Sequence, residues 1–430
     1  MTPDLAVYRL ACSSPQRVGT IRSGDLPSSS SFSYDPSYLA LPEAVPLSLS
    51  LPLRGEPFDQ ADFRPYFEGL LAEAHARQEL AAKLRLREDD WLGLLAACGR
   101  DCIGGVLIAP EGEVVGGHLD YEAIDSKRLK LMFQDLPAIA EQNVDMRLSL
   151  AGAQGKTGLV HDPQCSMQEG WFVPQGLAAT THILKASPLR DIPEVEFLCM
   201  KAAQACGIKT ANASLLNCGT LVLAVERFDR KVAQGEHSWQ VERLHQEDLC
   251  QAFGIPSGSK YAELEGGSVR GIAALLRERS ARPARDIAEF ARLLVFNYAI
   301  GNCDAHLKNY SLLYGNGSGG RCSVSLAPAY DLVSTTYFPR YSRNMAMVFG
   351  GVESIDEVTP ETFKHVAQDL GITVGALKHL AAPITERLLP ALVQAGEGEL
   401  GDVLKSTPYV ADDLANDVKP RLEVLRAFCE

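Results

Sequence analysis

The chain has 430 residues, of which 46% are hydrophobic and 22% are charged, an ordinary composition for a folded protein of two or three subdomains. Its formal net charge of −13 argues against a general nucleic-acid-binding protein, which would need a surplus of Lys and Arg. No apolar run reaches the length of a membrane helix, no export signal is visible and the count of 11 cysteines is odd, so we expect a cytoplasmic protein without a membrane segment.

Residues 1–110 are predicted to form an N-terminal subdomain, and residues 111–145 a connecting segment. Residues 47–53 place leucine at every second position, which predicts a half-buried strand. Apolar spacing elsewhere in the subdomain predicts two more strands and three helices. The strands are expected at 6–10 and 18–21, and the helices at 62–71, 80–86 and 89–97.

Residues 146–230 are predicted to be β-rich, with a turn of small residues between two strands in the stretch 147–160. Gly155-Lys156-Thr157 resembles the end of a Walker A loop, but Leu150 stands where that motif needs its first glycine, and no helix follows. We therefore expect no Walker-type NTPase but a flexible loop that covers phosphates. This loop would comprise Ala151, Gly152, Ala153, Gln154 and Lys156.

A lysine at a strand end is a candidate for binding nucleotide phosphates. Lys185 ends the apolar strand predicted at 180–185, and the helix predicted at 195–206 carries Glu196, the type of partner that positions such a lysine in kinases. Glu194 is a rival for that role. The alternative interpretation is a solvated lysine at a sheet edge.

A second candidate nucleotide contact follows the all-apolar strand predicted at 221–225. Glu226, Arg227 and Phe228 stand where a hinge between two kinase lobes would run, and the backbone there would bind adenine while Phe228 packs nearby. The alternative interpretation is a connector with an ordinary surface ion pair.

Asp304, Asn309 and Asp331 form the densest chemical pattern of the chain. This order is typical of protein-kinase-like phosphotransferases, where the first Asp takes the proton of the acceptor hydroxyl and the Asn and second Asp hold magnesium ions. Strands predicted at 310–314 and 322–326 would form a hairpin that returns Asp331 toward Asn309. The alternative is a loop after a helix that its Asp and Asn side chains merely hold in place.

Two motifs that contain histidine have a structural alternative. His306, two residues after Asp304, would either contact phosphate or brace the loop. Residues 244–250 combine His, Gln, Glu and Asp, but a capped helix start with buried polar contacts explains them more simply than metal binding does. We assign the second motif no catalytic role.

Strands dominate up to about residue 230, and helices, including one predicted at 286–300, dominate after about residue 240. This order predicts an α+β fold with two lobes, like that of a protein kinase. Residues 146–230 would form a β-rich ATP-binding lobe, and residues 231–430 a helical catalytic lobe.

Together these segments resemble the HipA family, the serine/threonine kinase toxins of bacterial persistence modules. The resemblance covers nearly the whole chain. The matching segments are residues 47–53, 66–71, 149–154 with Lys156 and Thr157, 181–185, 225–230, 245–248 with Lys260 and Tyr261, 301–309 and 330–332.

The resemblance implies that the protein uses ATP and Mg²⁺. It implies Asp304 as the catalytic base and Asn309 and Asp331 as the metal ligands. Ser149, at the start of the small-residue loop, matches the family's autophosphorylation site, where a phosphate would compete with ATP for the same hydrogen-bond donors. The nucleotide contacts would be Ala151, Gly152, Ala153, Gln154, Lys156, Lys185, Glu226, Arg227, Phe228, His306 and Lys308.

The family also implies partners. These are a HipB-like helix-turn-helix antitoxin, operator DNA bound through that antitoxin, and a protein substrate, an aminoacyl-tRNA synthetase and in particular glutamyl-tRNA synthetase. Phosphorylation of the synthetase would inhibit translation and promote dormancy. The chain departs from the family at Gly155, where glutamate is common, and at Cys303, where threonine or another small residue is common. The alternatives are a small-molecule kinase and a corepressor that binds an antitoxin and senses ATP without turnover.

Overall fold

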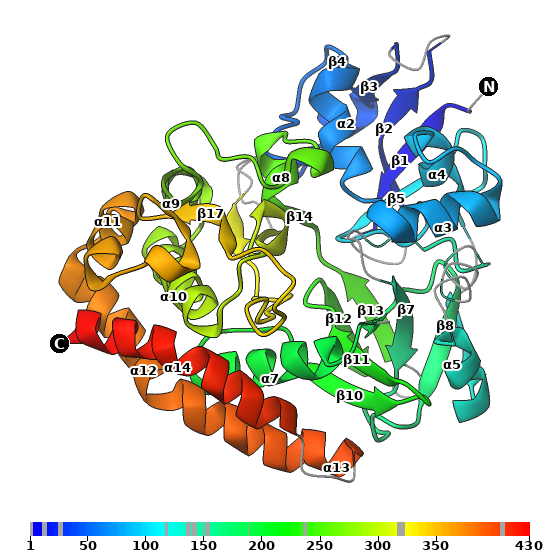
Figure 1. The fold of residues 1–430 in the computed structure, drawn as a ribbon. Coiled ribbons are helices and arrows are strands. Elements are labelled where there is room, and N and C mark those ends of the chain that lie inside the picture. The colour runs from blue at the N-terminus through cyan, green and yellow to red at the C-terminus, as the bar shows by residue number, and fades with distance from the viewer. Residues whose placement is uncertain are drawn as a thin grey trace. The chain divides into compact units, whose positions relative to one another are not determined.

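The computed structural model describes most of the chain (Figure 1). The described residues are 3–10, 15–24, 29–116, 119–134, 139, 143, 145–148, 150, 155–187, 189–234, 239–315, 323–404 and 409–430. The chain divides into two compact units. The first holds residues 1–187, 216–259 and 312–322, and the second holds residues 188–215, 260–311 and 323–430. The four-part division predicted from the sequence is a different partition and remains a prediction.

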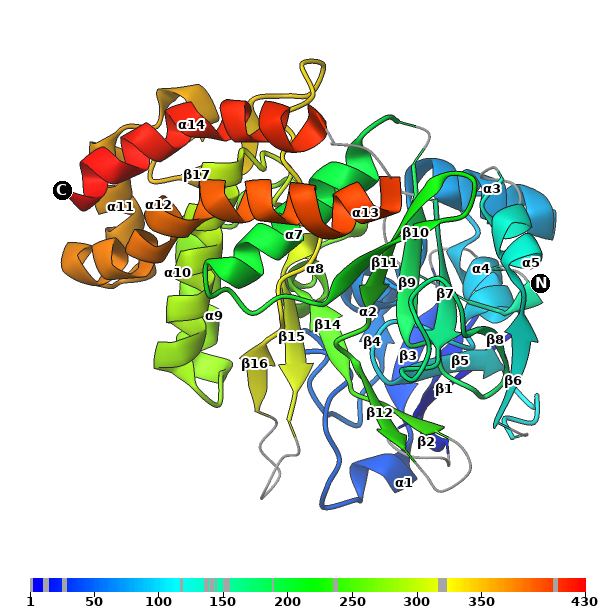
Figure 2. The ribbon, with the colours of Figure 1, turned by 90° about the horizontal axis from the view of Figure 1, so that it is seen from below.

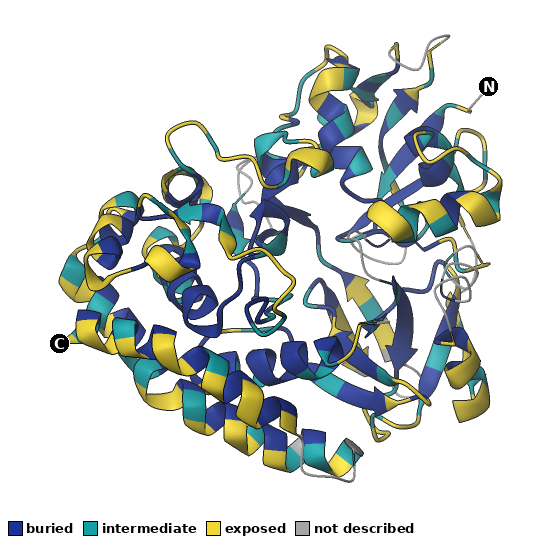
Figure 3. Cartoon of the chain, viewed as in Figure 1, coloured by how far each residue is buried: buried dark blue, intermediate teal, exposed yellow. Residues whose placement is uncertain are grey.

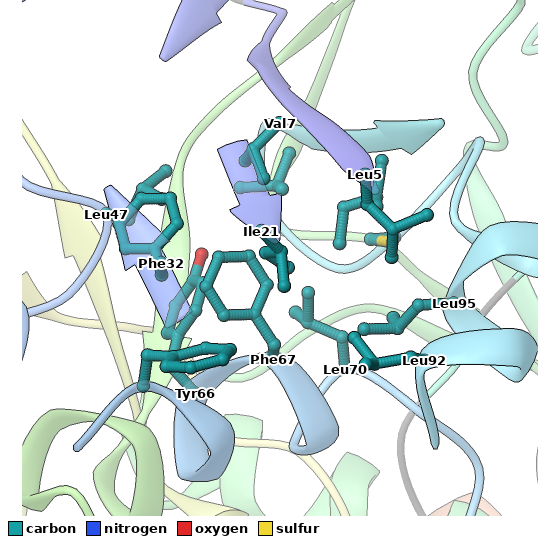
Figure 4. Packing of buried hydrophobic residues seen from close by; sticks show 14 of the residues in the cluster. Leu5, Val7, Ile21, Phe32, Leu47, Tyr66, Phe67, Leu70, Leu92 and Leu95 are labelled. Carbon is teal, nitrogen blue, oxygen red and sulfur yellow. The ribbon is translucent and has the colours of Figure 1, made fainter. Parts of the chain in front are cut away.

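The first unit opens with a five-stranded antiparallel sheet and short helices. These elements are β1 (Leu5–Arg9), β2 (Gln16–Arg22), β3 (Ser31–Tyr34), α1 (Pro36–Leu39), β4 (Phe58–Asp59), α2 (Gln60–Glu68), α3 (Ala74–Leu84), α4 (Trp91–Cys98) and β5 (Val106–Pro110). The strand order is β4-β3-β2-β1-β5. Figure 4 shows the core between sheet and helices, where the rings of Phe32 and Phe67 lie 5.2 Å apart between centroids. The strands predicted at 6–10 and 18–21 and the helices predicted at 62–71 and 89–97 are confirmed within a few residues, whereas the helix predicted at 80–86 begins six residues earlier, as α3.

Residues 47–53 do not form the predicted strand. An isolated bridge joins Ser48 to Leu51, and two prolines in or beside the segment have no N–H to give to a sheet ladder. Leu47 and Leu51 enter the core, but Ser48 between them is fully buried as well. The alternating leucines therefore contact the core separately and do not form a strand. The hydroxyl of the buried serine forms a hydrogen bond with the carboxylate of Glu247.

Glu247 holds this segment to the motif at 244–250 within the first unit. Its carboxylate accepts hydrogen bonds from Ser48 Oγ at 2.5 Å, from the Leu49 amide at 3.0 Å and from the Tyr314 hydroxyl at 2.5 Å. Burial raises the pKa of Glu247 to about 7, although the hydrogen bond from Ser48 opposes the shift. The next residue, Asp248, caps a helix. The motif therefore has the structural role that was predicted.

Replacing Glu247 by glutamine is expected to flatten the pH dependence of stability. The folded chain keeps this carboxyl protonated up to about pH 7, whereas the unfolded chain ionises it near 4.5. The folded state therefore binds more protons between these values, and its stability falls as pH rises, by up to about 1.4 kcal/mol per pH unit. Glutamine has no proton to lose. Urea unfolding from about pH 5 to about pH 8 measures the slope.

The control for this experiment is Glu242→Gln, which changes a half-exposed glutamate of the same unit. It is expected to keep the wild-type slope. Parallel wild-type and Glu247→Gln profiles would contradict the prediction.

A six-stranded sheet follows along the chain. Its elements are β6 (Leu119–Ile124), β7 (Gly155–His161), β8 (Trp171–Gly176), β9 (His182–Ala186), β10 (Ala213–Asn217) and β11 (Leu221–Glu226), with α5 (Ser126–Met132). The order is β10-β11-β9-β7-β8-β6. The segment 111–145, predicted to be a connector, thus contains a strand and a helix. The strand was missed although Leu119, Tyr121 and Ala123 alternate with Asp120 and Glu122, and the structure leaves none of its residues buried.

The start of β7 corrects the predicted phosphate-covering loop. Lys156 lies on this strand and not in a loop, because Gly155 already pairs with Ala186 of β9. Gly158 continues the strand, which confirms that the segment is no Walker loop. The strand predicted before the turn is reduced to a bridge between Leu148 and Asp101. Ser149, Ala151, Gly152, Ala153 and Gln154 lie outside the described residues.

Short elements complete the first unit. They are β12 (Arg230–Gln234), β13 (Trp239–Arg243), β14 (Gln246–Asp248), α8 (Leu249–Phe253) and a 3-10 turn, Ser257–Ser259. Asp248 and Gln251 form a capping box at the start of α8. β12 and β13 pair as an antiparallel hairpin that the sequence analysis did not predict.

The second unit is mostly helical, as predicted for the later part of the chain. Its helices are α7 (Ile192–Ala205), α9 (Ser268–Arg279), α10 (Pro283–Ile300), α11 (Pro360–Leu370), α12 (Val374–Ala395), α13 (Gly401–Leu404) and α14 (Tyr409–Cys429), with a π-helical segment, Gly396–Leu400, and 3-10 turns at Leu307–Asn309 and Ile355–Glu357. α12 and α14 pack side by side (Figures 1 and 2). Both alternate buried and exposed residues along their length (Figure 3), as expected for helices that cover one side of a core.

Four short strands complete the chain: β15 (Ser311–Tyr314), β16 (Val324–Leu326), β17 (Asn344–Phe349) and β18 (Val352–Ser354). The strands predicted at 310–314 and 322–326 are confirmed as β15 and β16. The amide of Ala327 donates to the carbonyl of Ser311 at 2.8 Å, so the chain does return to the start of β15. The turn predicted at 316–320 lies outside the described residues. None of the helices described here is both long and apolar enough to cross a bilayer.

Candidate active site

The end of α10 delivers the chain into the loop that carries Asp304. Gly301 closes the helix in the left-handed conformation at φ 76°. A Cβ at this position would collide with the hydroxyl of Thr336 and the guanidinium of Arg421, so the turn needs a glycine for both reasons. The amide of Asn302 then donates to the carbonyl of Asn297 at 2.8 Å, which anchors the loop to the helix.

Asparagine side chains hold the backbone of the loop. Asn302 Oδ1 accepts from the Asp304 amide at 3.1 Å, and its Nδ2 donates to Asn297 Oδ1 at 3.0 Å. Asn297 in turn donates to the Tyr310 hydroxyl at 3.2 Å. The alternative interpretation of the motif, a loop held by its own side chains, is thus right for Asn302. It does not explain Asp304, whose side chain takes no part in this network.

The spacing of five residues places Asn309 beside Asp304. The carbonyl of Asp304 accepts from the His306 amide at 2.8 Å and from Asn309 Nδ2 at 3.2 Å, across the single 3-10 turn Leu307–Asn309. Because the amide nitrogen of Asn309 binds this carbonyl, its Oδ1 is turned the other way. Asn309 therefore presents an oxygen of the kind that binds magnesium.

Two contacts tie the segment of Asp331 to the two ends of this loop. On one side, the Tyr330 hydroxyl donates to the carbonyl of Lys308 at 2.7 Å. On the other, Thr335 Oγ1 accepts from the Cys303 amide at 2.8 Å and donates to the carbonyl of Gly301 at 3.1 Å. The backbone of Asp331 is consequently fixed next to the loop of Asp304.

Asp331 itself has an unusual backbone conformation, with φ 54°. Residues other than glycine seldom adopt the left-handed region, and such conformations persist where the surroundings enforce them, often at functional sites. The donor set is an Asp331 carboxylate and an Asn309 amide oxygen, both hard oxygen ligands, which fits a magnesium ion.

His306 and Lys308, predicted to be nucleotide contacts, are both buried in this loop. The ring of His306 packs edge-on against Tyr261 with 5.2 Å between centroids. The carbonyl of Lys308 accepts the hydrogen bond from Tyr330. Both residues thus contribute to the scaffold of the loop, and their contacts with a nucleotide remain predictions.

In the first unit, Lys185 lies directly opposite Lys156 in the antiparallel pairing of β9 with β7. Directly opposite residues point to the same face, and two like charges there repel. Leu184 belongs to the core of this sheet, so the alternation of the strand puts the two lysines on the other face. The predicted pairing of Lys185 with Glu196, a buried residue of α7, remains a prediction.

The side chain of Arg227 is buried in the first unit. Its guanidinium donates to Asp229, to Thr180 Oγ1 at 2.8 Å and to the carbonyl of Cys102 at 3.0 Å. Its backbone amide donates to the carbonyl of Thr181 at 2.8 Å. The side chain therefore holds the fold, and the ion pair expected as a surface feature is a buried one. The hinge contacts with a nucleotide expected of Glu226, Arg227 and Phe228 remain predictions.

Arg227 belongs to a buried charge cluster that the sequence analysis missed. The cluster consists of Asp101, Arg227, Asp229, Arg230 and Arg243, all of them buried. Although burial opposes ionisation, Arg227 and Arg230 hold the pKa of Asp229 at about 2. The available signal was the run of charges directly after an all-apolar strand, which is an unusual place for a solvated surface.

Comparison with known proteins places this geometry in a family. The family model described as the HipA-like C-terminal domain matches residues 148–394, and that of the HipA N-terminal domain matches residues 11–109. The Sinorhizobium fredii protein "Putative kinase Y4mE" is 34% identical over 408 residues, which cover 92% of this chain and 90% of that protein. The "Serine/threonine-protein kinase toxin HipA" of Shewanella oneidensis is 26% identical over 401 residues, covering 90% and 87%.

A solved structure agrees in fold. The Shewanella oneidensis HipA in a complex with HipB and its operator DNA matches with a TM-score of 0.79 at 22% identity, over 99% of each chain. This match confirms the kinase-like α+β fold predicted from the order of strands and helices. The chain belongs to the HipA family, which includes a serine/threonine-protein kinase toxin.

Proposed function

We propose that this protein is an ATP- and magnesium-dependent serine/threonine protein kinase of the HipA type. The observation that carries the proposal is the attachment of the Asp331 segment to both ends of the Asp304–Asn309 loop. It keeps a carboxylate base and two metal-type oxygen ligands in one part of the second unit. Phosphoryl transfer requires mainly positioning and charge stabilisation, and this arrangement can supply both.

Asp304 would orient the acceptor hydroxyl and take its proton. Asn309 Oδ1 and the Asp331 carboxylate would hold magnesium, which neutralises charge on the phosphates when it is bound. Lys156 and Lys185, whose charges face the same side of the sheet, would bind the phosphates of ATP.

The remaining nucleotide contacts rest on the family resemblance. Backbone groups of Glu226, Arg227 and Phe228 would bind adenine, and His306 and Lys308 would support the phosphates. Ser149 would be the site of self-inactivation by autophosphorylation, with Ala151, Gly152, Ala153 and Gln154 in the loop that follows it.

Membership of the HipA family supports a protein substrate. We propose an aminoacyl-tRNA synthetase, with glutamyl-tRNA synthetase first, whose phosphorylation would inhibit translation. The match to a HipA that was solved with HipB and operator DNA supports a helix-turn-helix antitoxin as a partner.

Quantitative phosphoproteomics in a bacterial host tests the substrate. Cells that express the wild type are compared with cells that express Asp304→Asn, and new phosphoserine or phosphothreonine sites are expected on a synthetase and on Ser149. Equal phosphoproteomes, together with phosphorylation of a small molecule by the purified protein, would refute the assignment as a protein kinase.

The replacement Lys185→Gln is expected to weaken the binding of magnesium-ATP by about tenfold or more, because a charge-assisted hydrogen bond to phosphate is worth roughly 1.5–3 kcal/mol. Isothermal titration calorimetry gives the dissociation constant. Lys231→Gln, an exposed lysine of the same unit, is the matched control and should bind like the wild type. Equal affinity of the Lys185 variant would remove this lysine from the nucleotide site.

A further inference from the structure

Tyr261 contacts the proposed catalytic base, although no role has so far been assigned to it. Its hydroxyl donates to Asp304 Oδ1 at 2.8 Å. Its ring packs edge-on against His306, and Lys260 Nζ lies 5.4 Å from its centroid. The residue is nonetheless 54% exposed, so the hydrophobic effect alone does not explain its position.

The loop that carries Tyr261 is fastened to the same strand as the loop of Asp304. The carboxylate of Glu263 accepts from the Ser268 amide at 2.7 Å and from the Val348 amide in β17. Two residues before Val348, the Ala346 amide donates to the carbonyl of Cys303 at 2.8 Å. Hydrogen bonds to β17 thus fix both the loop of Tyr261 and the residue before Asp304. The contact between Tyr261 and Asp304 is therefore supported by the surrounding fold of the second unit.

We infer that Tyr261 is a positioning residue that holds the carboxylate of Asp304 in the orientation needed for phosphate transfer; this inference rests on the proposed function. The oxygen that Tyr261 binds is Oδ1 of the Asp304 carboxylate. We therefore assign different roles to the two oxygens of the Asp304 carboxylate. Oδ1 is held by the phenol, and Oδ2 is directed at the acceptor.

The reaction step follows from this division. The acceptor hydroxyl gives its proton to Oδ2 of Asp304, and its oxygen forms a bond with the γ-phosphorus of ATP. The bond between that phosphorus and the bridging oxygen breaks, and ADP leaves with the bonding electrons. Tyr261 keeps its own proton throughout. Without the phenol, the carboxylate would rotate away from this alignment.

The test is Tyr261→Phe, which removes the hydroxyl and keeps the ring against His306. The purified full chain is incubated with magnesium and radiolabelled ATP, and both ADP release and labelling of the protein are followed. The maximal rate is expected to fall about tenfold while KM for ATP stays the same, since a misplaced catalytic group slows the chemical step and not nucleotide binding. Tyr341→Phe, another half-exposed tyrosine of this unit, is the matched control and should keep the wild-type rate.

The outcomes separate this inference from the proposed function. If Asp304→Asn is inactive but Tyr261→Phe reacts like the wild type, Tyr261 is not a positioning residue and the proposed function stands. A raised KM for ATP at an unchanged maximal rate would also overturn the inference, because Tyr261 would then serve nucleotide binding. If Asp304→Asn keeps the wild-type rate, both the proposed function and the role of Tyr261 fail.

Discussion

Replacing Asp304 by asparagine is expected to lower the rate of phosphate transfer from ATP by about 10²-fold to 10⁴-fold, the range that a general base contributes. Asparagine has the same shape and can still accept the hydrogen bond from Tyr261, so the loop should keep its structure. It cannot take the proton of the acceptor hydroxyl. ADP release and transfer of labelled phosphate, each at saturating ATP, measure the effect.

The matched control is Asp412→Asn, which removes the charge of an exposed aspartate in α14 of the same unit. It should keep the wild-type rate, and both variants should have the thermal stability of the wild type. An Asp304 variant that retains wild-type activity, with its fold intact, would refute the role of Asp304 as the base.

The second large effect concerns stability, not catalysis. Asp101→Asn is expected to lower the free energy of unfolding by about 3–5 kcal/mol, because the removal of one partner leaves buried charges uncompensated. Asp101 Oδ1 accepts from Arg230 at 2.9 Å and from Arg243 at 3.2 Å, and Oδ2 accepts from the Thr180 hydroxyl at 2.8 Å. Without this carboxylate, Asp229 alone would face the buried guanidinium groups of the cluster.

The pKa of Asp101 determines in which direction the free energy of unfolding changes with pH. Burial by itself raises the pKa of Asp101, but Arg243, Arg230 and Arg227 together hold that pKa well below its ordinary range. The stabilisation is therefore present at neutral pH and is lost as pH falls below about 4, where the unfolded chain takes up the proton first. The asparagine variant should lack this acid-dependent loss.

Urea unfolding measures the free energy for both proteins, and Asp89→Asn provides the control. Asp89 pairs with Arg87 on the surface of the same unit, where neutralising one partner should cause no measurable change. Equal stability of wild type and Asp101→Asn would mean that the buried cluster contributes nothing to folding.

The parts of the site that could be predicted from the sequence are local. Asp304 and Asn309 lie five residues apart directly after the apolar helix α10, and a short hairpin separates them from Asp331, so residue order was enough to suggest a common site. The predictions from the sequence failed where a local pattern could arise from more than one kind of structure. The leucine alternation at 47–53 predicted a strand, but it reflects separate anchors in the core.

The contacts that could not be predicted join residues far apart in the chain. Tyr261 meets Asp304 across 43 positions, Arg230 meets Asp101 across 129, and Ser48 meets Glu247 across 199. Each depends on which faces of two elements come together and on which polar groups are then buried. The hydrophobic periodicity of a sequence does not show which elements pack together.

From the sequence alone, one could predict the general order of a strand-rich part followed by a helical part, the family and the three residues proposed for phosphotransfer, because local spacing and residue type carry that information. Only the tertiary structure decided that the side chain of Arg227 is buried, that Lys156 lies on a strand opposite Lys185, and that the Tyr261 hydroxyl contacts the Asp304 carboxylate. The physical reason is that the environment of a side chain comes from packing between distant segments, and it is this packing that decides whether a charge binds a ligand or stabilises the fold.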